Sequence, residues 1–174
     1  FRALSHLSLV TLAVYGLTLT GWNGAVFQIL SLGIVEGTMF VLLGALDSRF
    51  ATSQISMYGG LAAKLPRTAT YFVIATLPMV GLPLLSGFVG EFVILSSTFT
   101  GVSRGAAIFA ALGVILSVGY MLWLVQRLFY GPESTLAFSK SGADLRFGEL
   151  VALTPLVLLM LVMGVAPSLW FKTI

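Results

Sequence analysis

Residues 82–95 read LPLLSGFVGEFVIL, and they place a carboxylate, Glu91, inside one of the most apolar parts of the chain. The stretch belongs to a longer apolar segment, 67–99. A straight helix over that segment would run about 50 Å at ~1.5 Å per residue, whereas the hydrocarbon core of a bilayer is about 30 Å thick. The segment is therefore too long for one straight membrane span, and we expect an interruption.

The interruption is expected at Pro83, Ser86 and Gly87. Proline removes a backbone donor and glycine relaxes the backbone, so the two residues together favour a break in the helix. The sequence predicts a first half-helix to about residue 81, a non-helical link over 82–86, and a second half-helix to about residue 99.

Composition assigns the chain to the all-α integral membrane proteins. Hydrophobic residues make up 58% of its 174 residues and charged residues 9%, with a mean hydropathy of +1.05. These values lie far outside the range of soluble domains. We expect a single transmembrane domain of about five helices, one of them discontinuous, with spans at about 1–20, 24–45, 67–99 (broken near 82–87), 105–128 and 149–170.

Lysine and arginine predict the orientation of these spans. Five spans would put seven basic residues on one side, namely Arg2, Arg49, Lys64, Arg67, Arg127, Lys140 and Arg146. The other side would hold only Arg104 and Lys172. Because positive loops stay inside, the crowded side is predicted to be cytoplasmic or its organellar equivalent, and the C-terminus non-cytoplasmic.

Several functional classes are excluded or disfavoured by the residues present. The chain has no cysteine, which excludes thiolate-bound zinc, iron–sulfur clusters and disulfides within it. It has one histidine, no phosphate-binding glycine motif, and no basic run typical of nucleic-acid binding. We expect no cofactor and no metal in this chain, and the lipid bilayer rather than nucleic acid as its surroundings.

Three ionisable residues within the apolar segments predict a proton relay. Glu91 lies in the broken span, Glu36 near the middle of the second span, and His6 in the first. Ionisable groups at this depth normally face protein or water, and broken helices mark ion and substrate pathways. Imidazole titrates near neutral pH, and burial moves carboxylates toward that range.

Each of these residues also has a structural interpretation, which the sequence leaves open. Glu91 could satisfy the exposed amides of its half-helix, although it sits a few positions late for a cap. Glu36 lies between Gly33 and Gly37, small residues that often mark a helix–helix contact. His6 could be a hydrogen-bonded group near the end of a span.

Five motifs carry a resemblance to a known family. In order they are SHLSLVTLAVYGLTLTGWNGAVFQIL (5–30), GTMFVLLGAL (37–46), GGLAAKLP (59–66), GLPLLSGFVGEFVIL (81–95) and GYMLWLVQRLFYGP (119–132). Together they resemble the C-terminal part of the antiporter-like, proton-pumping membrane subunits of respiratory complex I, in particular the NADH-quinone oxidoreductase chain M / chain 4 family. The resemblance extends from near residue 1 to about residue 170.

The resemblance implies that the chain holds helices ten to fourteen of a fourteen-helix fold. Glu91 matches the proton-transfer carboxylate of the broken twelfth helix, and His6 matches a histidine of the hydrated central axis. The chain departs from the family pattern at residues 31–33, which read Ser-Leu-Gly where relatives usually read Asn-His-Gly. Glu36 stands four residues beyond the missing histidine, which leaves open whether it takes over proton transfer.

The resemblance further implies a membrane-arm subunit of NADH:quinone oxidoreductase, an enzyme complex, in a bacterial inner membrane. NADH, FMN, iron–sulfur clusters and quinone would belong to partner subunits, alongside other antiporter-like subunits. A multisubunit cation/proton antiporter and an energy-converting hydrogenase share the fold and remain alternatives. A non-conducting structural subunit is the alternative of a different class.

Overall fold

A computed structural model describes residues 2–52, 54–132 and 143–173, and its regular structure in these residues is helical, without strands. In chain order the elements are α1 (Arg2–Tyr15), α2 (Leu19–Phe50), the short 3-10 turns η1 (Ile55–Met57) and η2 (Leu61–Ala63), α3 (Pro66–Met79), α4 (Ser86–Gly101), α5 (Arg104–Val125), the π-helical turn η3 (Gln126–Tyr130), α7 (Phe147–Val165) and α8 (Pro167–Phe171). The predicted all-α class is confirmed.

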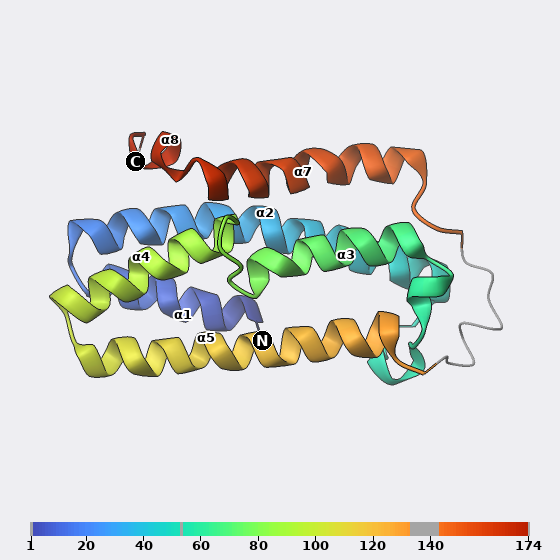
Figure 1. The fold of residues 1–174 in the computed structure, drawn as a ribbon, viewed down its shortest axis with the longest axis horizontal. Helices are drawn as coiled ribbons and strands as arrows, with labels where there is room; N and C mark the ends of the chain where they lie inside the picture. Colours follow the sequence, from blue (N-terminus) through green and yellow to red (C-terminus); the bar gives the residue numbers. More distant parts are fainter. Residues whose placement is uncertain (1, 53, 133–142, 174) are drawn as a thin grey trace.

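The helices form a bundle of roughly parallel and antiparallel rods around α2 (Figure 1). Helix α2 runs along the bundle and contacts α1, α3, α4 and α7. Helices α3 and α4 follow one another along the same direction, and α5 and α7 lie on opposite sides of them in this view. Among the described residues, three segments are long and apolar enough to cross a membrane, namely Leu19–Phe50, Arg104–Tyr130 and Phe147–Val165. The shorter apolar helix α1 begins near the middle of the bundle.

Helix α2 is longer than the apolar segment 24–45 from which a membrane span was expected. It begins where the Thr18 side chain accepts a hydrogen bond from the amide of Gly21 at 3.1 Å, and it continues through the polar residues 47–49 to Phe50. Leu17, with φ of 51°, turns the chain between α1 and α2. The expected span 1–20 therefore contains the whole of α1, the turn and the first residues of α2.

Helices α3 and α4 are separated by the link 80–85. Gly81 has φ of +69° and Leu84 of +75°, left-handed conformations that end one helix before the next begins. Ser86 and Gly87 lie in the first turn of α4, whereas Pro83 lies in the link. An added Cβ at Gly87 would lie 2.0 Å from the Pro78 carbonyl oxygen, so the two half-helices pack closely here.

Helix α7 covers the backbone of this link. An added Cβ at Gly164 would lie 2.2 Å from the carbonyl oxygen of Leu84 and 2.4 Å from the Cα atom of Leu85. Glycine permits this close approach, so the backbone at Leu84 and Leu85 lies directly against α7, while Leu82, Pro83 and the Leu84 side chain remain exposed. Non-helical backbone at membrane depth needs such shielding.

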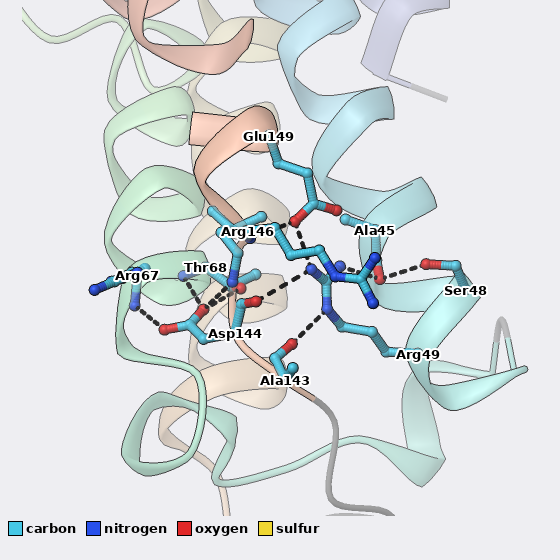
Figure 2. A network of polar contacts seen from close by, with 10 residues as sticks. Ala45, Ser48, Arg49, Arg67, Thr68, Ala143, Asp144, Arg146 and Glu149 are labelled. Atoms are coloured by element: carbon cyan, nitrogen blue, oxygen red, sulfur yellow. Dashed lines mark hydrogen bonds and ion pairs between the residues drawn. The ribbon is translucent and has the colours of Figure 1, made fainter. Parts of the chain in front are cut away.

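At the loop end of the bundle, a polar network joins α2, α3 and α7 (Figure 2). The Arg49 guanidinium contacts Glu149 Oε2 at 2.6 Å and donates to the carbonyl oxygens of Ala45 and Ala143, each at 2.6 Å. Asp144 accepts four hydrogen bonds, from the backbone amides of Arg67, Thr68 and Leu145 and from the Thr68 hydroxyl, at 2.7–2.9 Å. Asp144 thus caps the start of α3, at residues more than seventy positions earlier in the chain.

Candidate functional site at the helix break

Three buried polar side chains meet near the break between α3 and α4. His6 belongs to α1, Gln28 to α2 and Glu91 to α4, and they are 1%, 1% and 3% exposed. Helices α1, α2 and α4 contact one another, so each helix contributes one polar group to a shared interior. We call His6, Gln28 and Glu91 the mid-bundle cluster.

The imidazole of His6 lies between the other two side chains. Its Nδ1 atom is 3.1 Å from Glu91 Oε1, an ion-pair distance, and 3.4 Å from Gln28 Nε2, a hydrogen bond. The contact with Glu91 is close in distance without being aligned as a hydrogen bond. In the part of the chain that the structure describes, Glu91 Oε1, His6 Nε2 and Gln28 Oε1 are all buried without a hydrogen-bond partner.

Glu91 is also in contact with the link between the half-helices. An added Cβ at Gly81, whose φ is +69°, would lie 3.1 Å from Glu91 Oε2. The left-handed turn at Gly81 therefore passes directly beside the carboxylate. Glu91 is the sixth residue of α4, and among the described residues no backbone amide of that helix donates to it, so the carboxylate faces His6 and the link.

Ser86, the first residue of α4, joins the break to α2. The Ser31 hydroxyl donates a hydrogen bond to Ser86 Oγ at 2.8 Å, and both side chains are fully buried. The Ser31 position falls within the departure from the family pattern, and the adjacent Leu32 packs with Val10 and Ile94 in a small apolar cluster. An apolar side chain therefore occupies the position where the resemblance leads us to expect an imidazole.

The structure does not bring Glu36 into the mid-bundle cluster. Glu36 is half-buried on α2, eight residues beyond Gln28, which is about 12 Å along the helix axis. An added Cβ at Gly33 or Gly37 would meet nothing within 4 Å. Within the described chain, these glycines therefore do not form the helix–helix contact that their spacing suggests.

Gln28 is the member of the cluster that sequence reasoning missed. The sequence feature that could have identified Gln28 is an amide inside an otherwise apolar helical segment. A buried amide needs a hydrogen-bond partner. The described residues contain no group of three or more His, Cys, Asp and Glu side chains that could hold a metal ion. The cluster instead combines a carboxylate, an imidazole and an amide.

This arrangement is suited to moving protons over short distances. A carboxylate and an imidazole within about 3 Å of each other can exchange a proton directly, since each group has an atom that can accept or release one. The unpartnered atoms can hydrogen-bond to water or to another side chain, which would extend the path on both sides of the pair.

Comparisons with known proteins agree with the resemblance drawn from the motifs. Residues 1–119 match a family model described as NADH:quinone oxidoreductase/Mrp antiporter, TM. The chain is 39% identical over 168 residues to NADH-quinone oxidoreductase subunit M of Rickettsia typhi, covering 97% of this chain and 34% of that protein. It is 32% identical over 174 residues to NADH-ubiquinone oxidoreductase chain 4 of Chondrus crispus, covering 100% of this chain and 35% of that protein. The chain thus spans about a third of the length of these relatives.

Solved structures show the same architecture. A chain of respiratory complex I from Thermus thermophilus with bound NADH superposes with a TM-score of 0.89 at 35% identity, covering 97% of this chain and 35% of that chain. A chain of an archaeal membrane-bound sulfane sulfur reductase superposes with a TM-score of 0.80 at 22% identity, covering 92% of this chain and 27% of that chain. The second likeness shows that the fold recurs in a respiratory complex of different chemistry.

Proposed function

Since the chain belongs to the NADH:quinone oxidoreductase/Mrp antiporter transmembrane family, we propose that it forms part of a proton-translocating membrane-arm subunit of NADH:quinone oxidoreductase. The single observation that carries this proposal is the buried contact of 3.1 Å between Glu91 Oε1 and His6 Nδ1 beside a broken helix. Charged or ionisable pairs at membrane depth are costly and mark ion pathways.

In the proposed mechanism a proton passes between the Glu91 carboxyl and Nδ1 of His6. Glu91 takes a proton from the side of the link at Gly81 and gives it to Nδ1 of the imidazole, and the imidazolium so formed passes a proton onward from Nε2. The link supplies local backbone freedom, because its left-handed residues Gly81 and Leu84 are not held by regular helical hydrogen bonds. Glu36 would act at a later point, more than two helical turns along α2.

The energy for directed transport would come from other subunits. The chain itself would hold no redox cofactor, and NADH, FMN, iron–sulfur clusters and quinone would be bound by partners in the assembled enzyme. The proposed location is a bacterial inner membrane, with the loop end that carries Arg49 and Arg67 on the cytoplasmic side and the C-terminus opposite.

The test of the proton role is Glu91→Gln in the whole complex reconstituted into vesicles. Glutamine keeps the shape of the side chain but neither binds nor releases a proton in the physiological pH range. We expect fewer protons translocated per electron, with the complex still assembled on a native gel. Asp47→Asn removes a carboxylate at the loop end of α2 and serves as the matched control. An unchanged proton yield in an assembled Glu91→Gln complex would instead support a non-conducting structural subunit.

The coupled reaction has its own test. The native assembly is extracted in mild detergent and the proteins that accompany this chain are identified. We expect flavin- and iron–sulfur-bearing NADH dehydrogenase subunits. Recovery of hydrogenase subunits, or of antiporter subunits alone, would leave the proton relay in place and reject NADH:quinone oxidoreductase as its driver.

A further inference from the structure

The amide of Gln28 is the member of the mid-bundle cluster that the proposed proton exchange does not use. It is 1% exposed, its Nε2 lies 3.4 Å from His6 Nδ1, and its Oε1 is buried without a hydrogen-bond partner in the described chain. A buried amide with one end unsatisfied is costly, so its retention at this position calls for a reason.

The two neighbours of His6 Nδ1 make opposite demands on it. Glu91 Oε1 lies 3.1 Å from Nδ1. An ionised carboxylate is only an acceptor, so a hydrogen bond between the two atoms requires a proton on Nδ1. Gln28 Nε2, at 3.4 Å, can only donate to Nδ1, which requires a bare lone pair. One nitrogen cannot meet both demands at once, so the contacts of Gln28 and of ionised Glu91 exclude each other.

A half-turn of the amide resolves this conflict. It exchanges Nε2 for Oε1 with almost no change of shape, so that the oxygen faces the ring and accepts from a protonated Nδ1. With Nε2 toward the ring, the imidazole is neutral and carries its proton on the other nitrogen. With Oε1 toward the ring, Nδ1 carries a proton and can face both the amide and an ionised Glu91. Each amide orientation therefore matches one protonation state of the pair.

Gly90 holds this amide in place against α4. An added Cβ at Gly90 would lie 2.0 Å from Gln28 Oε1 and 3.0 Å from its side-chain carbonyl carbon. The amide therefore rests on bare backbone, one residue before Glu91 in the sequence. A side chain at position 90 would displace the amide from its place beside the imidazole.

No second charge competes with Glu91 for His6 in the described residues. Helices α2, α4 and α5 pack against α1. Apart from His6, the charged or titratable groups on these helices whose side chains the structure describes are Tyr15 on α1, Glu36, Asp47 and Arg49 on α2, Glu91 on α4, and Arg104 and Tyr120 on α5. Among them only Glu91 lies within ion-pair distance of the imidazole.

We propose that Gln28 is a positioning residue: the orientation of its amide selects which nitrogen of His6 carries a proton, and thereby whether Glu91 keeps or gives up its own. In the forward step the O–H bond of Glu91 breaks and an N–H bond forms at Nδ1, leaving a carboxylate and an imidazolium while the amide turns Oε1 to the ring. The reverse step restores the neutral pair. This inference rests on the proposed function and adds to it the residue, Gln28, whose amide orientation controls when the proton moves from Glu91 to His6.

The test compares Gln28→Met and Gln28→Glu in the assembled complex reconstituted into vesicles, with the rate of proton translocation measured from roughly pH 6 to 9, a range that brackets the ordinary pKa of imidazole. Methionine keeps the length of the side chain without donor or acceptor, and we expect proton transfer to slow about five-fold, the effect of one lost hydrogen bond. Glutamate adds a carboxylate that stabilises the imidazolium, and we expect the midpoint of the profile to move up by about one pH unit.

A structural role alone would lower assembly and leave the pH profile unmoved. Gly90→Ala displaces the amide without changing it, so we expect a shifted profile there as well. Gly113→Ala, at a position in α5 where an added Cβ meets nothing within 4 Å, is its matched control. Should Gln28→Met fail to assemble, Gly90→Ala and Gln28→Glu decide the question.

The outcomes separate this inference from the function it rests on. If Glu91→Gln leaves proton yield unchanged, the proposed proton role fails, and the positioning role fails with it. If Glu91→Gln lowers the yield while the Gln28 and Gly90 variants keep the wild-type profile, the positioning role alone is wrong.

Discussion

Two groups of polar side chains join the helices of this bundle, and they differ in how completely their hydrogen bonds are made. In the loop-end network, Asp144 accepts four hydrogen bonds and Arg49 is held by a carboxylate and by backbone carbonyl oxygens (Figure 2). In the mid-bundle cluster, three buried polar atoms have no partner in the described chain. A saturated network holds helices in place, whereas an unsaturated one retains donors and acceptors for a proton or for water.

The largest expected effect on stability is that of Asp144→Ala. The substitution leaves three backbone amides without their acceptor and uncaps α3, so we expect a loss of roughly 2–4 kcal/mol in the free energy of unfolding. The measurement is chemical denaturation of the detergent-solubilised protein. Asp144→Asn retains an acceptor oxygen and should lose less. An effect below about 1 kcal/mol for alanine would contradict the view that this network holds α3 to α7.

The sequence predicted the all-α class. It also predicted a helix break close to Gly87, and this break places Glu91 beside irregular backbone. Hydropathy and the proline–glycine spacing carry that information locally. Helix α2 extends beyond the expected span 24–45 at both ends, and Asp47, Ser48 and Arg49 are polar and yet helical. Arg49 is stabilised there by contacts with Ala143 and Glu149, nearly a hundred residues away, which no local pattern reveals.

The cluster was predictable only in part. His6 and Glu91 were expected from their chemistry, and the structure brings them within 3.1 Å, whereas Glu36 lies elsewhere on α2. Gln28 was missed because an amide attracts less attention than a charge in an apolar helix. Its importance depends on the approach of Gly90 from another helix, and a contact between helices is set by tertiary packing rather than by local sequence.

The counterpart to Asp144→Ala is Glu91→Gln measured for stability rather than transport. The carboxylate is buried and its Oε1 lacks a hydrogen bond, so a neutral amide relieves desolvation and removes few contacts. We expect the free energy of unfolding to stay within about 1 kcal/mol of wild type, on the stabilising side. The same denaturation experiment serves for both substitutions. A loss of 2 kcal/mol or more would mean that Glu91 holds the helices as firmly as Asp144 does.

The smallest expected effect is the response of the loop-end network to acid. Burial raises the pKa of Asp144, but the hydrogen bonds from the Thr68 hydroxyl and from the amides of Arg67, Leu145 and Thr68 outweigh it, so the pKa lies below its usual value. A lowered pKa in the folded state stabilises the protein above the unfolded-state pKa of about 3.9, and this stabilisation is lost as the pH falls through the lower, folded-state pKa.

Wild type should therefore lose more stability than Asp144→Asn between about pH 5 and pH 2, by about 1 kcal/mol or less, because solvent screens this partly exposed carboxylate. Denaturation midpoints of the two proteins, measured across that range in the same detergent, provide the comparison. If the denaturation midpoints of the two proteins changed equally with pH, the four hydrogen bonds would not stabilise the ionised form of Asp144. The loop-end network and the mid-bundle cluster would then differ in packing rather than in electrostatics.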